Sequence, residues 1–426
     1  MLNKLTYLFL LLLIIINGCA DNKSSVTVID FWAMGAEGEY VQKLVPVFEK
    51  LNPGIKVKVQ MVPWTAAQEK LITAFASNNL PDAFQLGNTW IPQFSAIGAI
   101  DKLDGLIETS KIVIKKNYFD GIWETNVLNG YVYGIPWYID TRLLYYRSDI
   151  LKKVGYETPP KTWDELFDVS KKIKVLFGKE EKYPIYLPTN EFAPFVILGL
   201  QNNASILKDN DSYGNFSQKE FVDAFKYAMS FYTHNLTPLG ISQVTNIYQA
   251  FRDEYIVMYI SGPWNIKEFQ KWMRGKLADS WSTAPLPSPD NNYPGVSLAG
   301  GASLVVSKNS PNKKAAWKFI EYLSEKETQL EFYNLSSDLP AIKSVWDEPL
   351  FKENKYMQAF YQQFQHVVPT PKVPEWEQIA FSKIQQYAEL TARKVLTVEE
   401  AMKRLDDEVN NILEKRRWLF AKAKSK

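Results

Sequence analysis

The sequence predicts an α/β protein, because segments with strand character alternate with segments of helical periodicity. Residues 26–32 are mostly β-branched and apolar, which favours a strand. Residues 39–51 place apolar side chains at the i, i+3, i+4 and i+7 positions of one helix face. Residues 55–62 alternate apolar and polar side chains, as a half-buried strand does. Strands that alternate with helices predict parallel pairing, with helices on both faces of the sheet.

Further elements follow the same reasoning. A helix is predicted over 66–77, and strands are predicted over 83–86, 256–260 and 303–307. Capping boxes, in which a hydroxyl and a carboxylate satisfy the first backbone amides, predict three helix starts. Their capping residues are Thr162, Ser217 and Thr397, each followed three positions later by Glu. The dipeptide Ser310-Pro311 predicts a fourth start, with Pro at the first helical position.

The composition excludes several classes of protein. A length of 426 residues predicts two to three domains, at roughly 150 residues each. Lys and Arg total 49 against 47 Asp and Glu, and this balance argues against a dedicated nucleic-acid binder. One Cys excludes a disulfide within the chain and, with two His, disfavours a zinc site. Because neither a Gly-x-Ser-x-Gly nor a His-Glu-x-x-His motif occurs, we expect no catalytic residue, no metal and no cofactor.

The N-terminus has the features of an export signal. Residues 1–18 carry a basic residue, Lys4, near their start, and their apolar run over 7–16 is too short to span a bilayer, which takes about 20 residues. Cys19 follows directly, and this arrangement resembles a bacterial lipoprotein signal. The resemblance implies that Cys19 is acylated and that residues 19–25 form a lipidated tether. The alternative is an ordinary secretory signal followed by an incidental Cys.

Four segments, taken in order, resemble the family of extracellular solute-binding proteins that deliver sugars to ABC transporters. The similar segments are residues 130–149 (GYVYGIPWYIDTRLLYYRSD), residues 251–267 (FRDEYIVMYISGPWNIK), Leu286-Pro287 followed by Gly300-Gly301, and the helix over 315–323 with the later Leu339-Pro340. The similarity covers nearly all of residues 26–426. Members of this family resemble maltose-binding protein.

The resemblance implies a two-lobed fold of the type II periplasmic-binding-protein class, in which each lobe is a β-sheet flanked by helices and a hinge joins the two. The expected lobes are 26–138 with 288–341, and 139–287 with 342–426. Ligand is expected in the cleft between them, since α/β sheets bind ligands beyond the carboxyl ends of their strands. The implied partners are a sugar, the permease subunits of an ABC transporter, and a membrane reached through the lipid on Cys19. We expect an exported monomer, held at the outer face of the cytoplasmic membrane or in the periplasm.

A sugar ring presents apolar C–H faces and a rim of hydroxyls, so aromatic plates beside planar polar groups suit it. Loops after the predicted strands supply such residues. The candidate ligand-binding residues are Trp32, Glu37, Trp64, Gln85, Asn88, Trp90, Trp137, Asp140, Arg142, Trp264, Gly300, Gly301 and Trp376. A Trp after a strand is often core, and Asp140 and Arg142 could simply pair with each other. The family resemblance favours a ligand role for Trp137 and Trp264.

Two other functions are consistent with the same residues. A glycosidase would share the aromatic side chains, but it needs two carboxyl groups about 5 to 9.5 Å apart, and the sequence does not give that distance. A binding protein for a different solute is the second alternative, with a polyamine, glycerol phosphate or an iron complex as ligand. The absence of a Gly-x-x-x-x-Gly-Lys-[Ser/Thr] motif agrees with a receptor that hydrolyses no nucleotide itself.

Overall fold

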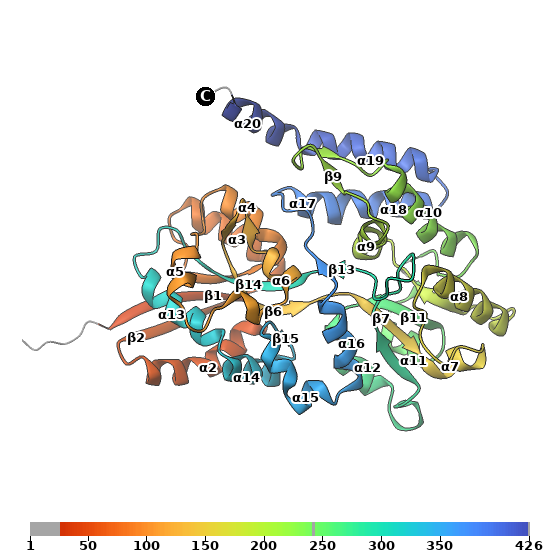
Figure 1. Ribbon diagram of the computed structural model, residues 1–426, viewed down its shortest axis with the longest axis horizontal. Helices are drawn as coiled ribbons and strands as arrows, with labels where there is room; N and C mark the ends of the chain where they lie inside the picture. The colour runs from red at the N-terminus through yellow and green to blue at the C-terminus, as the bar shows by residue number, and fades with distance from the viewer. Residues whose placement is uncertain (1–25, 241–242, 425–426) are drawn as a thin grey trace, which may run out of the picture.

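Two β-sheets divide the chain into two lobes that lie side by side (Figure 1). The computed structural model describes residues 26–240 and 243–424. The sheet of the N-terminal lobe has the order β15-β6-β14-β3-β1-β2, and that of the C-terminal lobe has the order β12-β7-β11-β8. The strands of the first are β1 (Thr27–Met34), β2 (Ile55–Val62), β3 (Ala83–Gly87), β6 (Ile135–Asp140), β14 (Gly300–Val306) and β15 (Leu339–Pro340). Those of the second are β7 (Leu143–Arg147), β8 (Tyr183–Tyr186), β11 (Ile256–Ser261) and β12 (Trp281–Ala284). The two-lobed α/β fold expected from the sequence is confirmed.

The pairing in the N-terminal sheet is only partly parallel. Strand β1 pairs in parallel with β2 and β3, as predicted, but β14 is antiparallel to both β3 and β6. The expectation of a parallel sheet is therefore wrong for β14 and also for β15, which is antiparallel to β6; in the second sheet it is wrong for β7, which is antiparallel to both β11 and β12. Strand β14 enters from the other lobe, so it begins at Gly300 beside Asp140, where β6 ends, and runs back to Val306 beside Ala83, where β3 starts.

The chain crosses between the sheets three times. It leaves the first sheet after Asp140, returns between Ala284 and Gly300, and leaves again after Pro340 toward α16 (Lys355–Phe364), which packs on β12 and β7. From these crossings we propose the lobe ranges 26–138 with 288–341, and 139–287 with 342–426. Short strand pairs complete the fold: β4 (Val127–Leu128) with β5 (Tyr131–Val132), β9 (Leu207–Lys208) with β10 (Tyr213–Gly214), and β13 (Ser297–Leu298) with β16 (Val367–Val368).

Helices cover the sheets, and their apolar faces follow the sequence periodicity. Those of the first lobe are α2 (Glu37–Leu51), α3 (Trp64–Ala76), α4 (Ile91–Ala96), α5 (Asp104–Thr109), α6 (Asp120–Glu124), α13 (Lys313–Leu323) and α14 (Lys326–Ser336). Those after the first crossing are α7 (Ser148–Lys153), α8 (Trp163–Phe177), α9 (Ala193–Gln201), α10 (Lys219–Thr233), α11 (Ile247–Arg252) and α12 (Ile266–Trp272). The C-terminal segment adds α15 (Pro349–Lys352), α16, α17 (Trp376–Gln378), α18 (Gln385–Ala392), α19 (Val398–Ile412) and α20 (Glu414–Lys424).

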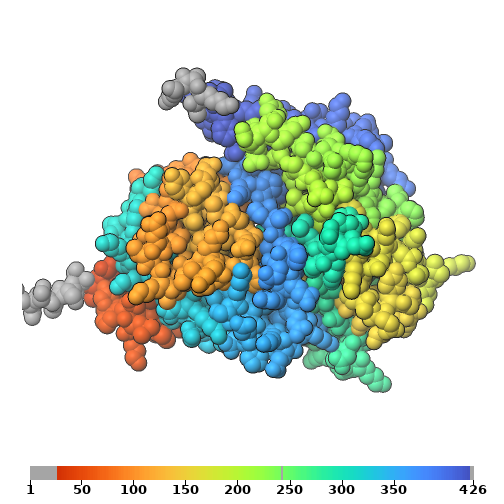
Figure 2. All heavy atoms as spheres, in the orientation of Figure 1, coloured from red at the N-terminus to blue at the C-terminus, as the bar shows by residue number. Residues whose placement is uncertain are grey.

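The predicted apolar stripe of α2 is buried at Val41, Leu44, Val45 and Phe48, which confirms its orientation. Figure 2 shows the blue C-terminal segment filling the seam between the lobes on the face in view.

Two of the four predicted helix starts are confirmed. Thr162 and Thr397 each accept a hydrogen bond from the backbone amide three residues on, both at 3.2 Å. The prediction for Ser217 is wrong, because Asp406 accepts bonds from both its amide and its hydroxyl, and α10 begins two residues later. The prediction at Ser310 is also wrong, since its hydroxyl turns to Asp82 and α13 begins at Lys313.

The predicted signal, Cys19 and the tether lie outside the described residues. Within the described ranges, no helix has both the length and the apolar character that crossing a membrane requires.

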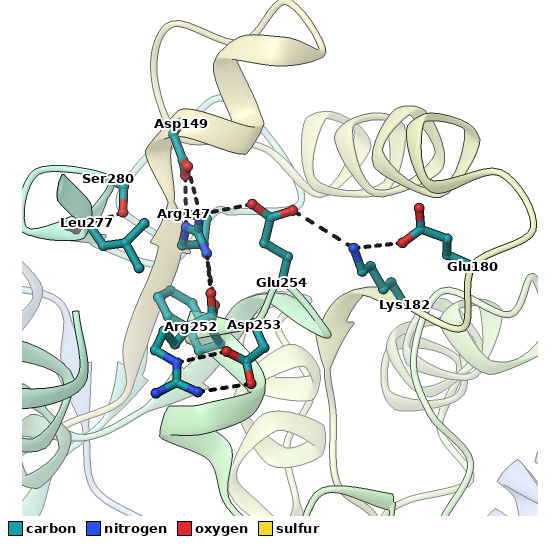
Figure 3. A network of polar contacts seen from close by, with 10 residues as sticks. Arg147, Asp149, Glu180, Lys182, Arg252, Asp253, Glu254, Leu277 and Ser280 are labelled. Atoms are coloured by element: carbon teal, nitrogen blue, oxygen red, sulfur yellow. Dashed lines mark hydrogen bonds and ion pairs between the residues drawn. The ribbon is translucent and has the colours of Figure 1, made fainter. Parts of the chain in front are cut away.

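A buried arginine joins three segments of the C-terminal lobe (Figure 3). Arg147, at the end of β7, is only 1% exposed and pairs with both oxygens of Asp149 at 2.8 and 2.7 Å. Its Nη1 donates to the carbonyl oxygen of Phe251 at 3.0 Å, and its Nη2, which also bonds Asp149, donates to Glu254 at 3.3 Å. A guanidinium buried this completely needs all of these partners, because an unpaired buried charge is strongly unfavourable. The network therefore ties β7, α7 and the end of α11 together.

Replacing Arg147 with Met should lower the free energy of unfolding by about 3 kcal/mol, the lower end of the cost of breaking a buried ion pair, because the two carboxylates are partly solvated. Chemical denaturation measures this change. The matched control is Arg252→Met, which removes an exposed, solvent-screened pair with Asp253 and should cost much less stability. Equal losses in the two variants would contradict the structural role of Arg147.

Candidate functional site

The cleft between the lobes holds two adjoining cavities. The first, called the Asp338 cavity, has a volume of about 500 Å³. It is lined by Glu37 of the first lobe, by residues 138–140 at the end of β6, by Trp264, Lys267 and Gln270 of the second lobe, by residues 336–339 at the end of and after α14, and by Leu350, Asn354 and Met357 nearby. The second, called the Trp64 cavity, has a volume of about 300 Å³. It is lined by Trp64, residues 87–90, Arg142, residues 298–301, Phe192, Thr370, Glu377 and Phe381. Both include Tyr138 and Asp140, so these two residues stand where the cavities meet.

A chain of hydrogen bonds builds the wall of the first lobe. The backbone amide of Met34 donates to the buried side chain of Gln85 at 2.8 Å, and Gln85 donates to the hydroxyl of Tyr138 at 2.9 Å. Tyr138 in turn donates to Glu37 at 2.8 Å, and the indole nitrogen of Trp64 donates to the same carboxylate oxygen at 3.3 Å. The chain joins β1, β3, β6, α2 and α3, and it fixes the Glu37 carboxylate at the edge of the cleft.

Gly35 permits this arrangement. It has a positive φ of 58°, which favours glycine, and it makes the turn between β1 and α2. A Cβ atom at this position would lie 2.8 Å from a Glu37 carboxylate oxygen and 2.9 Å from the Trp64 ring. Both side chains can therefore approach the backbone only because residue 35 has no side chain.

A second group joins the two lobes across the cleft. Arg142 pairs with Asp140 at 3.0 Å, and its guanidinium lies over the ring of Trp264, 4.6 Å from the centroid. Trp264 follows Gly262-Pro263 at the end of β11, and 52% of its surface is exposed. A Cβ atom on Gly262 would lie 2.1 Å from that ring, so the glycine lets the indole rest against the backbone.

Gly300 and Gly301 line the Trp64 cavity, but atoms of β6 already occupy the space that a side chain at either position would need. A Cβ atom at Gly300 would lie 2.1 Å from a carboxylate oxygen of Asp140, and one at Gly301 would lie 2.2 Å from the carbonyl oxygen of Tyr138. These glycines therefore allow β14 to pack closely against β6. They help to position Asp140, and their backbone also lines the Trp64 cavity.

Carboxyl groups crowd the Asp338 cavity. Asp338 follows the left-handed turn at Ser337, and its pKa is raised to about 7, first by burial and then by the charges of Glu37 and Asp140. The charge of Lys267 acts in the opposite direction. Burial also raises the pKa of Asp140, although Arg142 partly offsets this. No group of three or more His, Cys, Asp or Glu in the described ranges is arranged to hold a metal ion.

Aromatic pairs from both lobes line the Trp64 cavity. Trp64 and Trp90 of the first lobe meet edge to face with centroids 5.6 Å apart, and Phe192 and Phe381 of the second meet at 4.9 Å. Trp64 is 37% exposed and Phe381 is 55% exposed, so each pair offers apolar surface to the cavity. Glu377 contributes a partly buried carboxyl, and burial raises its pKa while hydrogen bonds to Thr89 and Trp90 lower it.

Besides the two glycines, eight of the thirteen candidate ligand residues lie at the wall of the cleft or directly behind it. The side chains of six of them line the cavities and present aromatic rings or charged groups to a ligand: Glu37, Trp64, Trp90, Asp140, Arg142 and Trp264. Asn88 also lines the Trp64 cavity, but it is nearly buried and donates to the carbonyl oxygen of Ala299 at 2.8 Å. Gln85 is fully buried behind Tyr138, so it positions that residue and does not face the cleft.

Three tryptophan predictions are corrected by the structure. Trp137 has no exposed surface and stacks on Phe332 at 4.5 Å, because alternate residues of β6 point into the core. Trp376 is 1% exposed, so the cavity is lined by its neighbour Glu377 instead. Trp32 lies beside α3, where Lys70 covers its ring, and it lines a different surface concavity.

The sequence reasoning missed several cleft residues. Tyr138 is the neighbour of Trp137, and strand alternation alone could have assigned the two to opposite faces. Asp338 and Lys267 carried no local signal, because only the packing of α14 and α12 around the cleft brings them there. Another concavity, of about 430 Å³ around Asn246 and Asp253, lies on the C-terminal lobe away from the cleft.

Two lobes around a cleft lined from both sides define a class of proteins that enclose a small ligand. The chain belongs to the family of bacterial extracellular solute-binding proteins, whose profile matches residues 43–359. The sugar-binding protein MalE from Xanthomonas citri is 43% identical, with a TM-score of 0.89, and the match covers 93% of this chain and 99% of that one. An ABC transporter solute-binding protein from Thermotoga lettingae, bound with α-D-tagatose, is 26% identical with a TM-score of 0.74, covering 91% of this chain and 100% of that one. The maltodextrin-binding protein MdxE of Bacillus subtilis is 25% identical, covering 80% of this chain and 79% of its own.

Asp338 should make stability depend on pH. Since its pKa is about 7 in the folded chain and 3.8 as an ordinary carboxyl, the folded state holds a proton that the unfolded state has lost between these values. The free energy of unfolding should therefore fall as pH rises from about 4 to about 7. Asp338→Asn should flatten this dependence and raise the melting temperature above neutral pH, as measured by thermal unfolding over a pH series.

Asp168 supplies a control of opposite sign. Hydrogen bonds from Lys172 and Tyr156 lower its pKa, so its charged form stabilises the fold and Asp168→Asn should be less stable at neutral pH. A melting profile of Asp338→Asn that still parallels the parent chain would contradict the crowding of carboxyl groups in the cleft.

Proposed function

We propose that this chain is the receptor of an ABC transporter and captures a sugar, with a disaccharide or short oligosaccharide favoured, in the cleft between its lobes. The bound sugar is then delivered to a membrane permease. The single observation that carries this proposal is the lining of the cleft. Exposed aromatic rings from both lobes stand beside carboxylates and a guanidinium within two adjoining cavities.

The cavity chemistry matches a sugar ring in two respects. Trp264 and Trp64 offer flat apolar surface to the C–H faces of a ring, which neutral polar ligands without such faces would not use. Glu37, Asp140 and Arg142 offer paired acceptors and donors to hydroxyl groups, and hydrogen bonds to charged partners are stronger than neutral ones. The two cavities meet at Tyr138 and Asp140, so a ligand of more than one ring could occupy both.

The charge of the cleft bears on the alternative solutes. Four carboxyl groups line the cavities against two cations, namely Glu37, Asp140, Asp338 and Glu377 against Lys267 and Arg142. An excess of acid groups repels an anion, which disfavours glycerol phosphate. A polyamine would be attracted instead, and it remains the alternative solute that the lining best accommodates. The aromatic rings suit the C–H faces of a sugar, and they would also suit the ammonium groups of a polyamine through cation–π contacts, so binding measurements must separate these two ligands.

A secreted glycosidase is the remaining alternative. Asp338, with its raised pKa beside the Glu37 carboxylate, resembles the acid and base pair that such enzymes use. Membership of a solute-binding family supports a receptor instead, as does the division of the contacts between two lobes. We propose that the chain binds its ligand without changing a covalent bond and needs no cofactor.

Closure of the lobes follows from the distribution of contacts. Trp264 and Arg142 belong to the C-terminal side of the first crossing, whereas Glu37 and Trp64 belong to the first lobe. A sugar reaches both groups only when the lobes are close together, so it binds the closed form more tightly and shifts the population toward it. The closed, loaded monomer docks on the permease, and ATP hydrolysis by the partner subunits opens it.

Anchoring completes the proposed function. Acylation of Cys19 would hold the exported chain at the membrane, and the mass of its N-terminal peptide would reveal the attached lipid. Homologous maltooligosaccharide-binding proteins of Streptococcus pneumoniae are described as lipoproteins, which supports this assignment.

Titration calorimetry against mono-, di- and oligosaccharides tests the proposed function, with spermidine and glycerol phosphate in the same series. At least one sugar should bind with a dissociation constant in the micromolar range or below, which corresponds to a binding free energy of about −8 kcal/mol or a more negative value. Incubation with that sugar should release no reducing ends. Turnover would establish the glycosidase, and binding of spermidine alone would establish the polyamine receptor.

Trp264→Ala should weaken sugar binding about tenfold, equivalent to about 1.4 kcal/mol, because it removes one aromatic plate and the support of Arg142. The matched control is Trp272→Ala, which removes a partly exposed Trp on α12 that lies under Arg252 and outside the cleft. Trp137→Ala, in contrast, should destabilise the fold by about 3–5 kcal/mol, because its ring is core. Unchanged affinity in Trp264→Ala would remove this residue from the site.

A further inference from the structure

The C-terminal helix α20 projects beyond the body of the C-terminal lobe and ends the described chain (Figure 1). It continues from α19, and its first turn contacts the β9–β10 hairpin of the lobe. There, Arg417 donates to the carbonyl oxygen of Ser212 at 3.0 Å and lies over the ring of Tyr213, 4.6 Å from the centroid. The residues that follow extend past the β9–β10 hairpin, as the dark blue tip of Figure 2 shows.

Three consecutive apolar side chains of this helix are exposed. Trp418 is 57% exposed, Leu419 is 49% exposed and Phe420 is 40% exposed. Successive helical residues are about 100° apart, so these partly exposed side chains are spread over about 200° of the helix circumference. Large apolar side chains gathered on one exposed segment mark an interaction surface, whereas single ones are ordinary.

Positive charge is concentrated on the same helix. Residues 414–424 contain five Lys or Arg against one Glu, a net charge of +4. The remaining chain has 44 basic against 46 acidic residues, a net charge of −2, so the excess of the whole protein resides here. Cations also lie against the aromatic rings, with Lys422 4.8 Å from the Trp418 centroid and Arg416 4.8 Å from that of Phe420.

We propose that α20 binds the surface of an anionic lipid bilayer. Lys and Arg are attracted to anionic headgroups, while Trp, Leu and Phe enter the boundary between headgroups and acyl chains. An acidic protein would satisfy the cations but would not need three apolar side chains spread around the helix. The contact is separate from the ligand cleft and does not depend on acylation of Cys19.

The test is co-sedimentation of unacylated protein, from residue 20 onward, with vesicles of equal parts phosphatidylglycerol and phosphatidylcholine. The protein should sediment with these vesicles and not with pure phosphatidylcholine, and high salt should release it. The triple variant Trp418→Ala, Leu419→Ala, Phe420→Ala and the double variant Lys415→Glu, Lys422→Glu should each lower the vesicle affinity by about tenfold or more.

The control is the double variant Val175→Ala, Leu176→Ala, which removes exposed apolar side chains from α8 and should leave vesicle binding unchanged. Melting temperature and ligand affinity should stay unchanged in all the variants. Failure to bind anionic vesicles would overturn the proposal, as would equal binding by the triple variant. Self-association through α20 without vesicle binding, seen by analytical ultracentrifugation, would replace the lipid surface with a second copy of the chain. None of these outcomes bears on sugar binding.

Discussion

The cleft depends on one buried phenol. Tyr138 is held between Gln85 and Glu37, and both hydrogen bonds are required because a polar group without a partner is costly in the interior. Through this residue the strand order of the first sheet fixes the position of a carboxylate on α2. The wall facing the ligand is therefore held rigidly by the sheet behind it. Its side chains lose little conformational entropy when a ligand binds, so little binding free energy is lost in ordering them.

The other side of the cleft is organised by a charge. Arg142 neutralises Asp140 and covers Trp264, so one guanidinium sets the orientation of an acceptor and of an aromatic plate. This pair stands where the chain first passes between the lobes. A change in the angle between the lobes would alter its geometry directly, and for this reason the site and the hinge cannot be separated into independent parts.

Local patterns in the sequence predicted the elements well and the site incompletely. The strands at 55–62 and 256–260 and the apolar face of α2 follow from periodicity, since each depends on neighbours in the chain. Trp137 was misassigned because a motif places a residue on a strand but does not say which face it occupies. Asp338 was missed because its neighbours in the cleft, Glu37 and Asp140, lie far from it in sequence, and only the packed fold unites them.

The position of β14 has a consequence for biosynthesis. This strand lies between β6 and β3, so the first sheet remains two separate pieces until residues 300–306 have left the ribosome. Pairing over such sequence distances is slow, because the intervening chain must be closed into loops before the contacts form. The nascent polypeptide therefore cannot complete the first sheet before β14 has been synthesised, and until then one edge of β3 lacks its strand partner.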